Sequence, residues 1–327
     1  AQPVLRESAT LAGMRERLHT FSFGFEDHVS ELPYAQEIAA RYGTVHEELT
    51  ARDVDIAHEL LRMDSIYDEP LADSSTIPTC LISRMAAKHL KVILPGDGAD
   101  ELMGGYNWWY RPLVARDERS GLFAGIGRLL AGRARYAKRF AAKPVYFRNE
   151  DLEALGIGAD GARYTDSSGR RPVGDITDAL AMDTANYMPG DILVKTDRAA
   201  MASSLELRAP FLDADLAAFV LTLPGEYKIT TRADKIILRE AYADAWTNAI
   251  RSRGKQGFGA PVPQWITRPT VAALKRSYLN DPRRAVFSLL NYDAVQRFAA
   301  EDSQKSWSLL VFAIWFENRP SLHGARG

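Results

Sequence analysis

The order of apolar and polar positions in the first hundred residues predicts strands and helices in alternation. Runs that alternate or are rich in β-branched residues are typical of strands, and apolar positions near helical spacing are typical of helices. Strands are expected at 18–25, 45–49 and 91–95, and helices at 32–42, 51–62 and 76–89. We expect Gly43 to end the first helix, Ser74 and Ser75 to cap the third, and the last strand to be buried. This order predicts an α/β fold with a parallel sheet and flanking helices.

Helical periodicity dominates the second half of the chain. Helices are expected at 175–187, 190–203, 213–222, 233–245, 270–279, 291–300 and 304–317, with a short extended piece at 228–230. The sequence shows no internal repeat and no long linker. We therefore divide the chain into an α/β nucleotide-binding part, residues 1–110, and a mainly helical remainder, residues 111–327.

Composition narrows the class of protein. Of the 327 residues, 46% are apolar and 25% are charged, and the net charge is −1. This balance gives no reason to expect nucleic acid or a membrane surface as a partner. No apolar run approaches the ~20 residues of a spanning helix, and no signal-peptide pattern is present. Cys80, the single cysteine, is expected to be a small buried apolar residue, which leaves no disulfide framework, and the cytoplasm is the default location.

The first candidate site follows the apolar run at 92–94, within Pro95-Gly-Asp-Gly-Ala-Asp-Glu-Leu-Met-Gly-Gly-Tyr106. Loops at the carboxyl ends of strands are where ligands bind in open α/β sheets. Gly96 and Gly98 let backbone N–H groups approach an anion, and Asp97, Asp100 and Glu101 add three carboxylates. Acids beside backbone donors suit a metal ion that carries phosphate. The alternative is a strand, a turn and a helix start whose acids favour the helix dipole.

A second charged segment runs from Asp191 to Asp213. Asp191 and Lys195 are spaced i, i+4 on a predicted helix. Asp197 and Arg198 lie in a largely apolar run, where charged groups need partners. Glu206 and Arg208 are more typical of structural salt bridges at a corner.

A third segment, Arg253-Gly-Lys-Gln-Gly-Phe-Gly-Ala-Pro261, places Lys255 among glycines. Such a lysine can bring its ammonium group to a phosphate or a developing anion. The order of a Walker A motif is absent. The arginine-rich stretch at 115–140 is more typical of a solvated helix face than of a lid over phosphates.

Together these segments resemble the synthetase domain of the glutamine-dependent asparagine synthetase family. The resemblance also includes Leu18-His-Thr-Phe-Ser-Phe-Gly-Phe25 and Asp68-Glu-Pro-Leu-Ala-Asp-Ser-Ser-Thr-Ile-Pro78, and it spans residues 18 to 318 in order. It implies an adenine nucleotide alpha hydrolase-like fold of the ATP-pyrophosphatase type. It also implies a ligase that uses ATP and Mg²⁺ to adenylate a side-chain carboxylate, after which an amine displaces AMP and pyrophosphate leaves.

The resemblance assigns roles to single residues. Asp100 is a Mg²⁺ ligand, and Lys255 stabilises the adenylation transition state and the departing pyrophosphate. Asp97 stands where many members carry Glu and the β-lactam-forming relatives carry Tyr, so an acid there can deprotonate the attacking ammonia. The remaining assignments are Gly96 and Gly98 at the α-phosphate, Ser22 and Phe23 beside the adenine, and Asp73, Ser74, Ser75, Asp197 and Arg198 at the substrate.

Two parts of the family's pattern are missing from the sequence as given. The nucleotide loop Ser-Gly-Gly-x-Asp-Ser is not found before Leu18, and neither is an amino-terminal glutaminase domain with its cysteine nucleophile. We expect the natural protein to carry both upstream of Ala1, and the chain as given to bind ATP weakly. The expected partners are a small carboxylate, ammonia or glutamine, and a glutaminase domain upstream or in trans, with a homodimer as a further expectation.

Three functions stay open at this point. The first is amidation, with aspartate to asparagine as its simplest form. The second is ATP-driven ring closure of the lasso-peptide or β-lactam type; Asp97 in place of Tyr argues against the β-lactam form. The third is a non-catalytic homologue. The joint presence of five residues argues against it: Asp97, Asp100, Lys255, Asp197 and Arg198.

Overall fold

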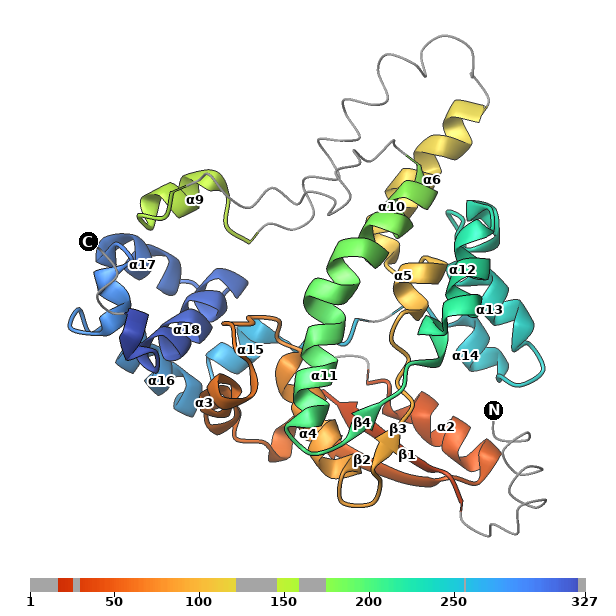
Figure 1. The fold of residues 1–327 in the computed structure, drawn as a ribbon, viewed down its shortest axis with the longest axis horizontal. Helices are drawn as coiled ribbons and strands as arrows, with labels where there is room; N and C mark the ends of the chain where they lie inside the picture. Colours follow the sequence, from red (N-terminus) through yellow and green to blue (C-terminus); the bar gives the residue numbers. More distant parts are fainter. Residues whose placement is uncertain (1–16, 26–29, 122–145, 159–174, 256, 323–327) are drawn as a thin grey trace.

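The computed structural model describes residues 17–25, 30–121, 146–158, 175–255 and 257–322 (Figure 1). Most of the arginine-rich stretch at 115–140 lies outside these residues. No helix within the described ranges combines the length and the apolar character that crossing a membrane requires.

The strands are parallel, as predicted, but they form two small sheets. β1 (His19–Gly24) pairs with β2 (Val45–Thr50), and β3 (Val92–Ile93) pairs with β4 (Glu206–Leu207). β4 was not predicted, because a strand of two residues leaves no periodic pattern. The piece expected to be extended at 228–230 is not a strand; it follows a 3₁₀ turn at 225–227.

The prediction that the strand at 91–95 is buried was wrong. β3 is only two residues long, and Val92 and Leu94 are 38% and 63% exposed. Side chains alternate between the two faces of a strand. Only Ile93 therefore reaches the apolar cluster that β3 shares with Phe21 of β1 and Leu207 of β4.

Local capping explains where the first helices begin and end. α2 (Leu32–Tyr42) ends at Gly43, whose φ of 64° suits glycine and whose N–H bonds the carbonyl oxygen of Ala39. α3 (Ile56–Ile66) begins later than the predicted start at residue 51, because the Asp55 carboxylate accepts from the N–H groups of residues 57 and 58. Residues 51–53 form a 3₁₀ turn instead.

α4 (Thr76–Ala86) starts where predicted and ends three residues early. Ser75 occupies the predicted N-cap position, but neither it nor Ser74 supplies a side-chain cap. The side chain of Ser75 makes no capping hydrogen bond to the helix; the carboxylate of Asp73 accepts from both the N–H and the hydroxyl of Ser75. Asp73 therefore organises the entry to α4.

Two predicted helices are one continuous rod. α10 (Ile176–Met182), a π-helical segment η2 (Asp183–Ile192) and α11 (Leu193–Met201) follow without a break, and Figure 1 shows them as the long green helix. Pro189 lies inside η2 and has no N–H for regular α-helical bonding, and the wider π form tolerates this loss. The rod carries Lys195 on α11 against α4.

The remaining helices surround these elements (Figure 1). They are α5 (Ala99–Met103), α6 (Asn107–Gly121), α9 (Asn149–Ala154), α12 (Ala214–Thr222), α13 (Ile236–Ala241), α14 (Asn248–Ser252), α15 (Val262–Ile266), α16 (Pro269–Leu279), α17 (Tyr292–Ala299) and α18 (Gln304–Glu317). Further 3₁₀ turns lie at 210–212, 285–288 and 320–322. The largest apolar cluster joins α3 and α4 to α15, α16 and α18, with Trp265 and Trp307 fully buried in it.

Candidate functional site

Asp100 lies in the first turn of α5 between two lysines. Its Oδ1 is 2.7 Å from Nζ of Lys235, and its Oδ2 is 2.9 Å from Nζ of Lys255. Burial alone would raise the pKa of the Asp100 carboxyl, but the two ammonium groups outweigh it and hold that pKa below its ordinary value. Asp100 is therefore an ionised carboxylate with a positive charge on each side.

The glycines of the loop at 95–105 make room for this arrangement. Gly98 has a φ of 90°, and a Cβ there would lie 2.2 Å from a methyl carbon of Leu212. A Cβ on Gly105 would lie 1.6 Å from Oδ1 of Asp100 and 2.6 Å from Cε of Lys235. Gly96 has open space around it. Gly98 and Gly105 are thus required by geometry, and Gly105 leaves the space in which Asp100 pairs with Lys235.

We expect Gly98→Ala to lower the free energy of unfolding by about 1–3 kcal/mol, because alanine would be strained at this φ and Leu212 would have to move. Gly96→Ala is the matched control two residues away, with no positive φ and no atom within 4 Å of the new methyl group. It should change stability by less than about 0.5 kcal/mol. Urea unfolding of both variants measures the difference, and equal effects would contradict the strain argument.

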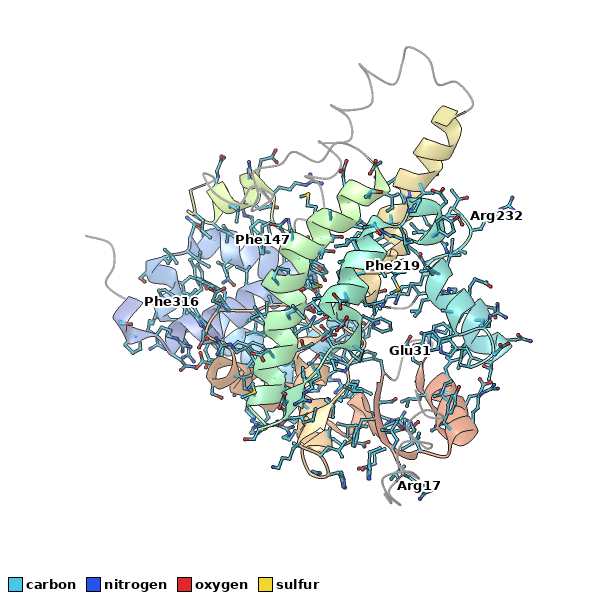
Figure 2. All side chains as sticks on the ribbon, turned by 45° about the vertical axis from the view of Figure 1, so that its right-hand side comes forward. Arg17, Glu31, Phe147, Phe219, Arg232 and Phe316 are labelled. Atoms are coloured by element: carbon cyan, nitrogen blue, oxygen red, sulfur yellow. The ribbon has the colours of Figure 1, made fainter. Side chains whose placement is uncertain are left out.

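Lys235 and Lys255 are held by a shared anchor, Arg239 of α13. Its guanidinium donates to the carbonyl oxygens of Arg251 and Arg253, at 2.5 and 3.2 Å, and to the carbonyl oxygen of Asp234 at 2.7 Å. Arg253 also pairs with Glu31, labelled in Figure 2, just before α2. The segments that present both lysines are therefore fixed next to each other.

A second group of charges lies between α4 and α11. Nζ of Lys195 is 2.5 Å from Oδ2 of Asp73, and the lysine is only 6% exposed. Its ion-pair partner is thus Asp73, although its helical spacing pointed to Asp191. Burial and the neighbouring Asp73 raise the pKa of Asp191 to about 6. Lys195 is therefore a buried cation beside two acids, and the pKa of Asp191 is higher than that of Asp73.

Asp97 connects the two groups. Burial raises the pKa of its carboxyl, while hydrogen bonding from Thr196 and the charge of Lys195 act against this effect. Asp100 adds a smaller repulsion. The third segment is also nearby, since the N–H of Ala260 donates to Oγ of Ser74 at 3.0 Å. The structure thus brings residues 73–75, 97–100 and 195–196 into one neighbourhood with Lys255 and Ala260 of the third segment.

Other residues expected at the site have different surroundings. Glu101 is buried, and its carboxylate accepts from the hydroxyl of Tyr106. The ring of Phe23 is buried and lies 5.2 Å from the ring of Phe25 between centroids, and Ser22 is half-buried beside it.

Asp197 and Arg198 are exposed on α11, although the apolar run around them had suggested burial. Arg198 pairs with Asp68 at 2.6 Å, with both side chains at least half exposed. Exposed pairs of this kind contribute little stability.

Sequence reasoning missed Lys235 as a member of the site and Lys195 as the partner of Asp73. Lys235 has a φ of 46° at the start of α13, and no motif marks it. The one available signal for Lys195 was a lysine within the apolar helical run 192–200.

The residues around Asp100 fit a nucleotide phosphate group with its Mg²⁺. An ionised carboxylate is a hard oxygen ligand, and Mg²⁺ in proteins is held by one or two carboxylates together with substrate phosphates. Lys235 and Lys255 supply positive charge for those phosphates. Asp100 would hold the ion, and the two lysines would then be free to turn to the phosphate oxygens.

Comparisons with known proteins show the family of this chain. The family model described as Asparagine synthase matches residues 7–317. The putative asparagine synthetase [glutamine-hydrolyzing] of Mycobacterium tuberculosis is 30% identical over 91% of this chain and 50% of its own length. Asparagine synthetase [glutamine-hydrolyzing] 1 of Bacillus subtilis is 30% identical over 91% of the chain and 52% of its own length. The chain thus spans about half the length of these relatives, and with the family model covering nearly all of it, the chain belongs to the asparagine synthase family.

Proposed function

We propose that this chain is the synthetase part of an ATP-dependent carbon–nitrogen ligase that amidates a side-chain carboxylate through an acyl-adenylate. The observation that carries the proposal is Asp100, ionised and placed between Lys235 and Lys255. Aspartate is the simplest substrate, because the names of the matching relatives refer to asparagine synthesis. The nitrogen comes from ammonia, or from glutamine through a glutaminase domain such as the names of these relatives imply.

The first half-reaction needs positive charge around the phosphates. Attack of a carboxylate oxygen on the α-phosphate joins the carboxylate to AMP and releases pyrophosphate, and negative charge grows on both phosphate groups. Mg²⁺ on Asp100 would supply Lewis-acid neutralisation of that charge. Lys255 and Lys235 stabilise the departing pyrophosphate from the other side, and the backbone at Gly96 and Gly98 faces the α-phosphate.

The second half-reaction needs a proton acceptor. Ammonia attacks the acyl carbon, the bond to the AMP oxygen breaks, and one proton must leave the nitrogen. Asp97 is suited to take it, because burial raises its pKa and makes its carboxylate more basic. Lys195, close to Asp97 and paired with Asp73, restrains how far this pKa rises.

The segment at 73–75 supports this centre by positioning. Asp73 has Oδ1 on Ser75 and Oδ2 on Lys195, so both oxygens already have partners. Ser74 bonds the backbone of Ala260. We therefore assign residues 73–75 to holding Lys195, and the segment that carries Lys255, beside the substrate. Ser22 and the backbone of Phe23 are assigned to the adenine. Asp197 and Arg198 are assigned to the margin of the substrate site.

The test follows an ¹⁸O label from the substrate carboxylate into the products. The natural protein that contains this chain is incubated with ATP, Mg²⁺, ammonia and aspartate carrying ¹⁸O in its side-chain carboxylate. Adenylation places one ¹⁸O in AMP and yields asparagine, whereas label in inorganic phosphate would contradict an acyl-adenylate. A product that has lost water and gained no nitrogen would identify a cyclase, and the absence of ATP binding would identify a non-catalytic homologue.

A further inference from the structure

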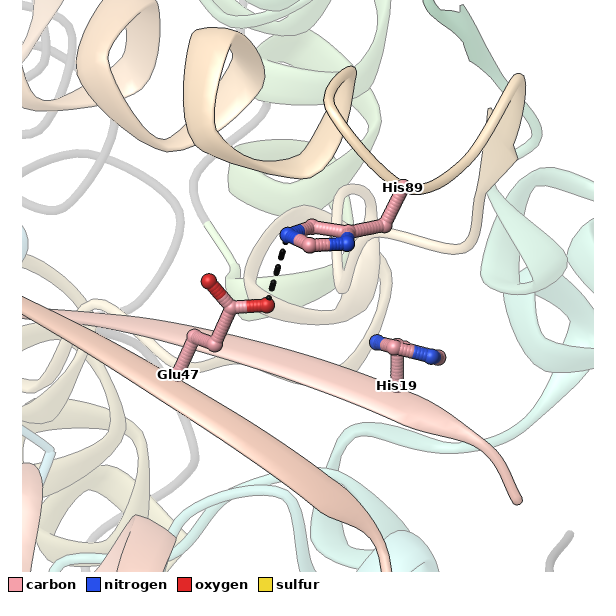
Figure 3. Close-up of side chains that lie close together, drawn as sticks. All are labelled: His19, Glu47 and His89. Carbon is pink, nitrogen blue, oxygen red and sulfur yellow. Dashed lines mark ion pairs between the residues drawn. The ribbon is translucent and has the colours of Figure 1, made fainter.

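Two histidines and a glutamate meet at the end of the β1–β2 sheet that lies away from the candidate centre. His19 is the first residue of β1, Glu47 lies in β2, and His89 follows the end of α4 (Figure 3). One potential ligand atom from each lies within 4.8 Å of the other two. Among the described residues, no other three side chains of the types His, Cys, Asp or Glu form such a group.

Strand register and a helix end bring these side chains together. In the parallel pair, Phe21 lies opposite Glu47, and residues two apart on a strand share a face, so His19 and Glu47 project from the same side of the sheet. The backbone N–H of His89 donates to the carbonyl oxygen of Ala86 at 3.0 Å, which fixes the turn after α4 above that face. The group therefore joins three separate segments of the chain.

The contacts within the group leave ligand capacity unused. Nε2 of His89 lies 2.9 Å from Oε1 of Glu47, and the rings of His19 and His89 stack with centroids 5.5 Å apart. Nδ1 of His19 is buried and has no hydrogen-bond partner among the described residues. An unpaired buried polar atom is costly, and a bound ion is one of the ways in which that cost is removed.

Two imidazoles and one carboxylate are donors that suit divalent transition metals such as Zn²⁺. Three such protein ligands can hold the ion and leave a fourth position for water. Side chains that are 39% exposed at His89 and 34% at Glu47 give an ion access from solvent. Mg²⁺ prefers oxygen ligands, so this donor set selects against the ion expected at Asp100. We propose that His19, Glu47 and His89 form a second metal site, for one zinc-class ion.

The ion would fasten the carboxyl-terminal end of α4 to the sheet. The amino-terminal end of the same helix carries Asp73 to Ser75, which contact Lys195 and Ala260. Metal bound at one end would therefore steady the helix that positions these residues at the other end. Binding to the folded chain alone raises its stability by mass action.

The experiment titrates the full chain, stripped of metal with a chelator, with Zn²⁺ and separately with Co²⁺ in the presence of excess Mg²⁺. Calorimetry should give one ion per chain, and Co²⁺ should give the visible absorption of a low-coordinate site. His19→Ala, Glu47→Gln and His89→Gln should each weaken binding by at least about tenfold, since even groups outside the ligand set typically contribute 10–100-fold. Zn²⁺ should also raise the midpoint of thermal unfolding.

The matched control is His46→Ala on the opposite face of β2. His46 also pairs with a glutamate, Glu48, at 3.1 Å, but the pair lacks a third ligand. This variant should bind Zn²⁺ like the unaltered chain. If His19→Ala does not fold, the partly exposed His89→Gln carries the test. Absence of Zn²⁺ binding, or binding that these substitutions leave unchanged, would show that the group is only an ion pair with stacked rings. Loss of Zn²⁺ binding in Asp100→Ala would instead assign the ion to the site at Asp100.

Discussion

Replacing Asp100 with alanine is expected to lower ATP–pyrophosphate exchange in the natural protein by at least about 10³-fold, the scale of removing a preorganised charge from a transition state. The substitution removes the proposed Mg²⁺ ligand and leaves Lys235 and Lys255 facing each other without a counter-charge. Lys255→Ala should have a similar effect. The double variant should lose little more, because groups that act as a unit are not additive.

Two controls separate chemistry from folding. Asp100→Asn keeps the shape and removes the charge, so it should lose exchange as Asp100→Ala does. Glu206→Ala removes an exposed carboxylate that pairs with Arg208 at 2.8 Å, and it should keep exchange. Unfolding of the Asp100 variants at the assay temperature, or exchange within tenfold of the unaltered protein, would contradict the proposed role.

Replacing Lys195 with methionine is expected to lower the free energy of unfolding by about 3 kcal/mol, the lower end for a buried pair, because it leaves the half-buried Asp73 beside Asp191 without a cation. Adding Asp73→Leu should restore only part of the loss. An apolar pair of similar volume often replaces a buried ion pair at little cost, but the N–H and the hydroxyl of Ser75 lose their acceptor. Arg208→Met, in an exposed pair, should cost less than about 1 kcal/mol. Urea unfolding of all three variants gives these values.

The effect of Lys195→Met should depend on pH. Lys195 helps to hold the pKa of Asp73 below its ordinary value, despite the opposing effect of burial, so the pair stabilises the fold above the ordinary pKa of the carboxyl and its contribution is lost at lower pH. In the variant, protonation of the two acids removes the repulsion between them. The stability difference should therefore be largest near neutral pH and shrink as the pH falls below about 6, the pKa of Asp191. A difference independent of pH would contradict this account.

Elements with local signals were predictable from the sequence. The helices expected at 291–300 and 304–317 occur at 292–299 and 304–317, and Asn291 and Ser303 cap them with side-chain hydrogen bonds. The strands at 18–25 and 45–49 were also predicted within one or two residues. Capping, periodicity and β-propensity are properties of adjacent residues, so the sequence shows them directly.

Features set by distant contacts were not predictable. The π-helical run at 183–192 lies between two stretches that look helical separately. At the site, Asp100 and Lys255 were marked by glycines next to them, but Lys235 is recognised only through its contact with Asp100. The partner of Lys195 depends on how α4 packs against α11, and an i, i+4 neighbour in sequence suggested a different one.

The anchoring of two lysines through Arg239 has a consequence for the energy of reaction. Cations on independent loops would have to reorient as charge moves onto the phosphates, and that reorganisation would add to the barrier. Here one guanidinium fixes the carbonyl oxygens at 251, 253 and 234, next to both lysines, before any nucleotide arrives. The backbone that carries both lysines would be positioned when the protein folds, so only the two side chains would have to turn towards the phosphates in each catalytic cycle.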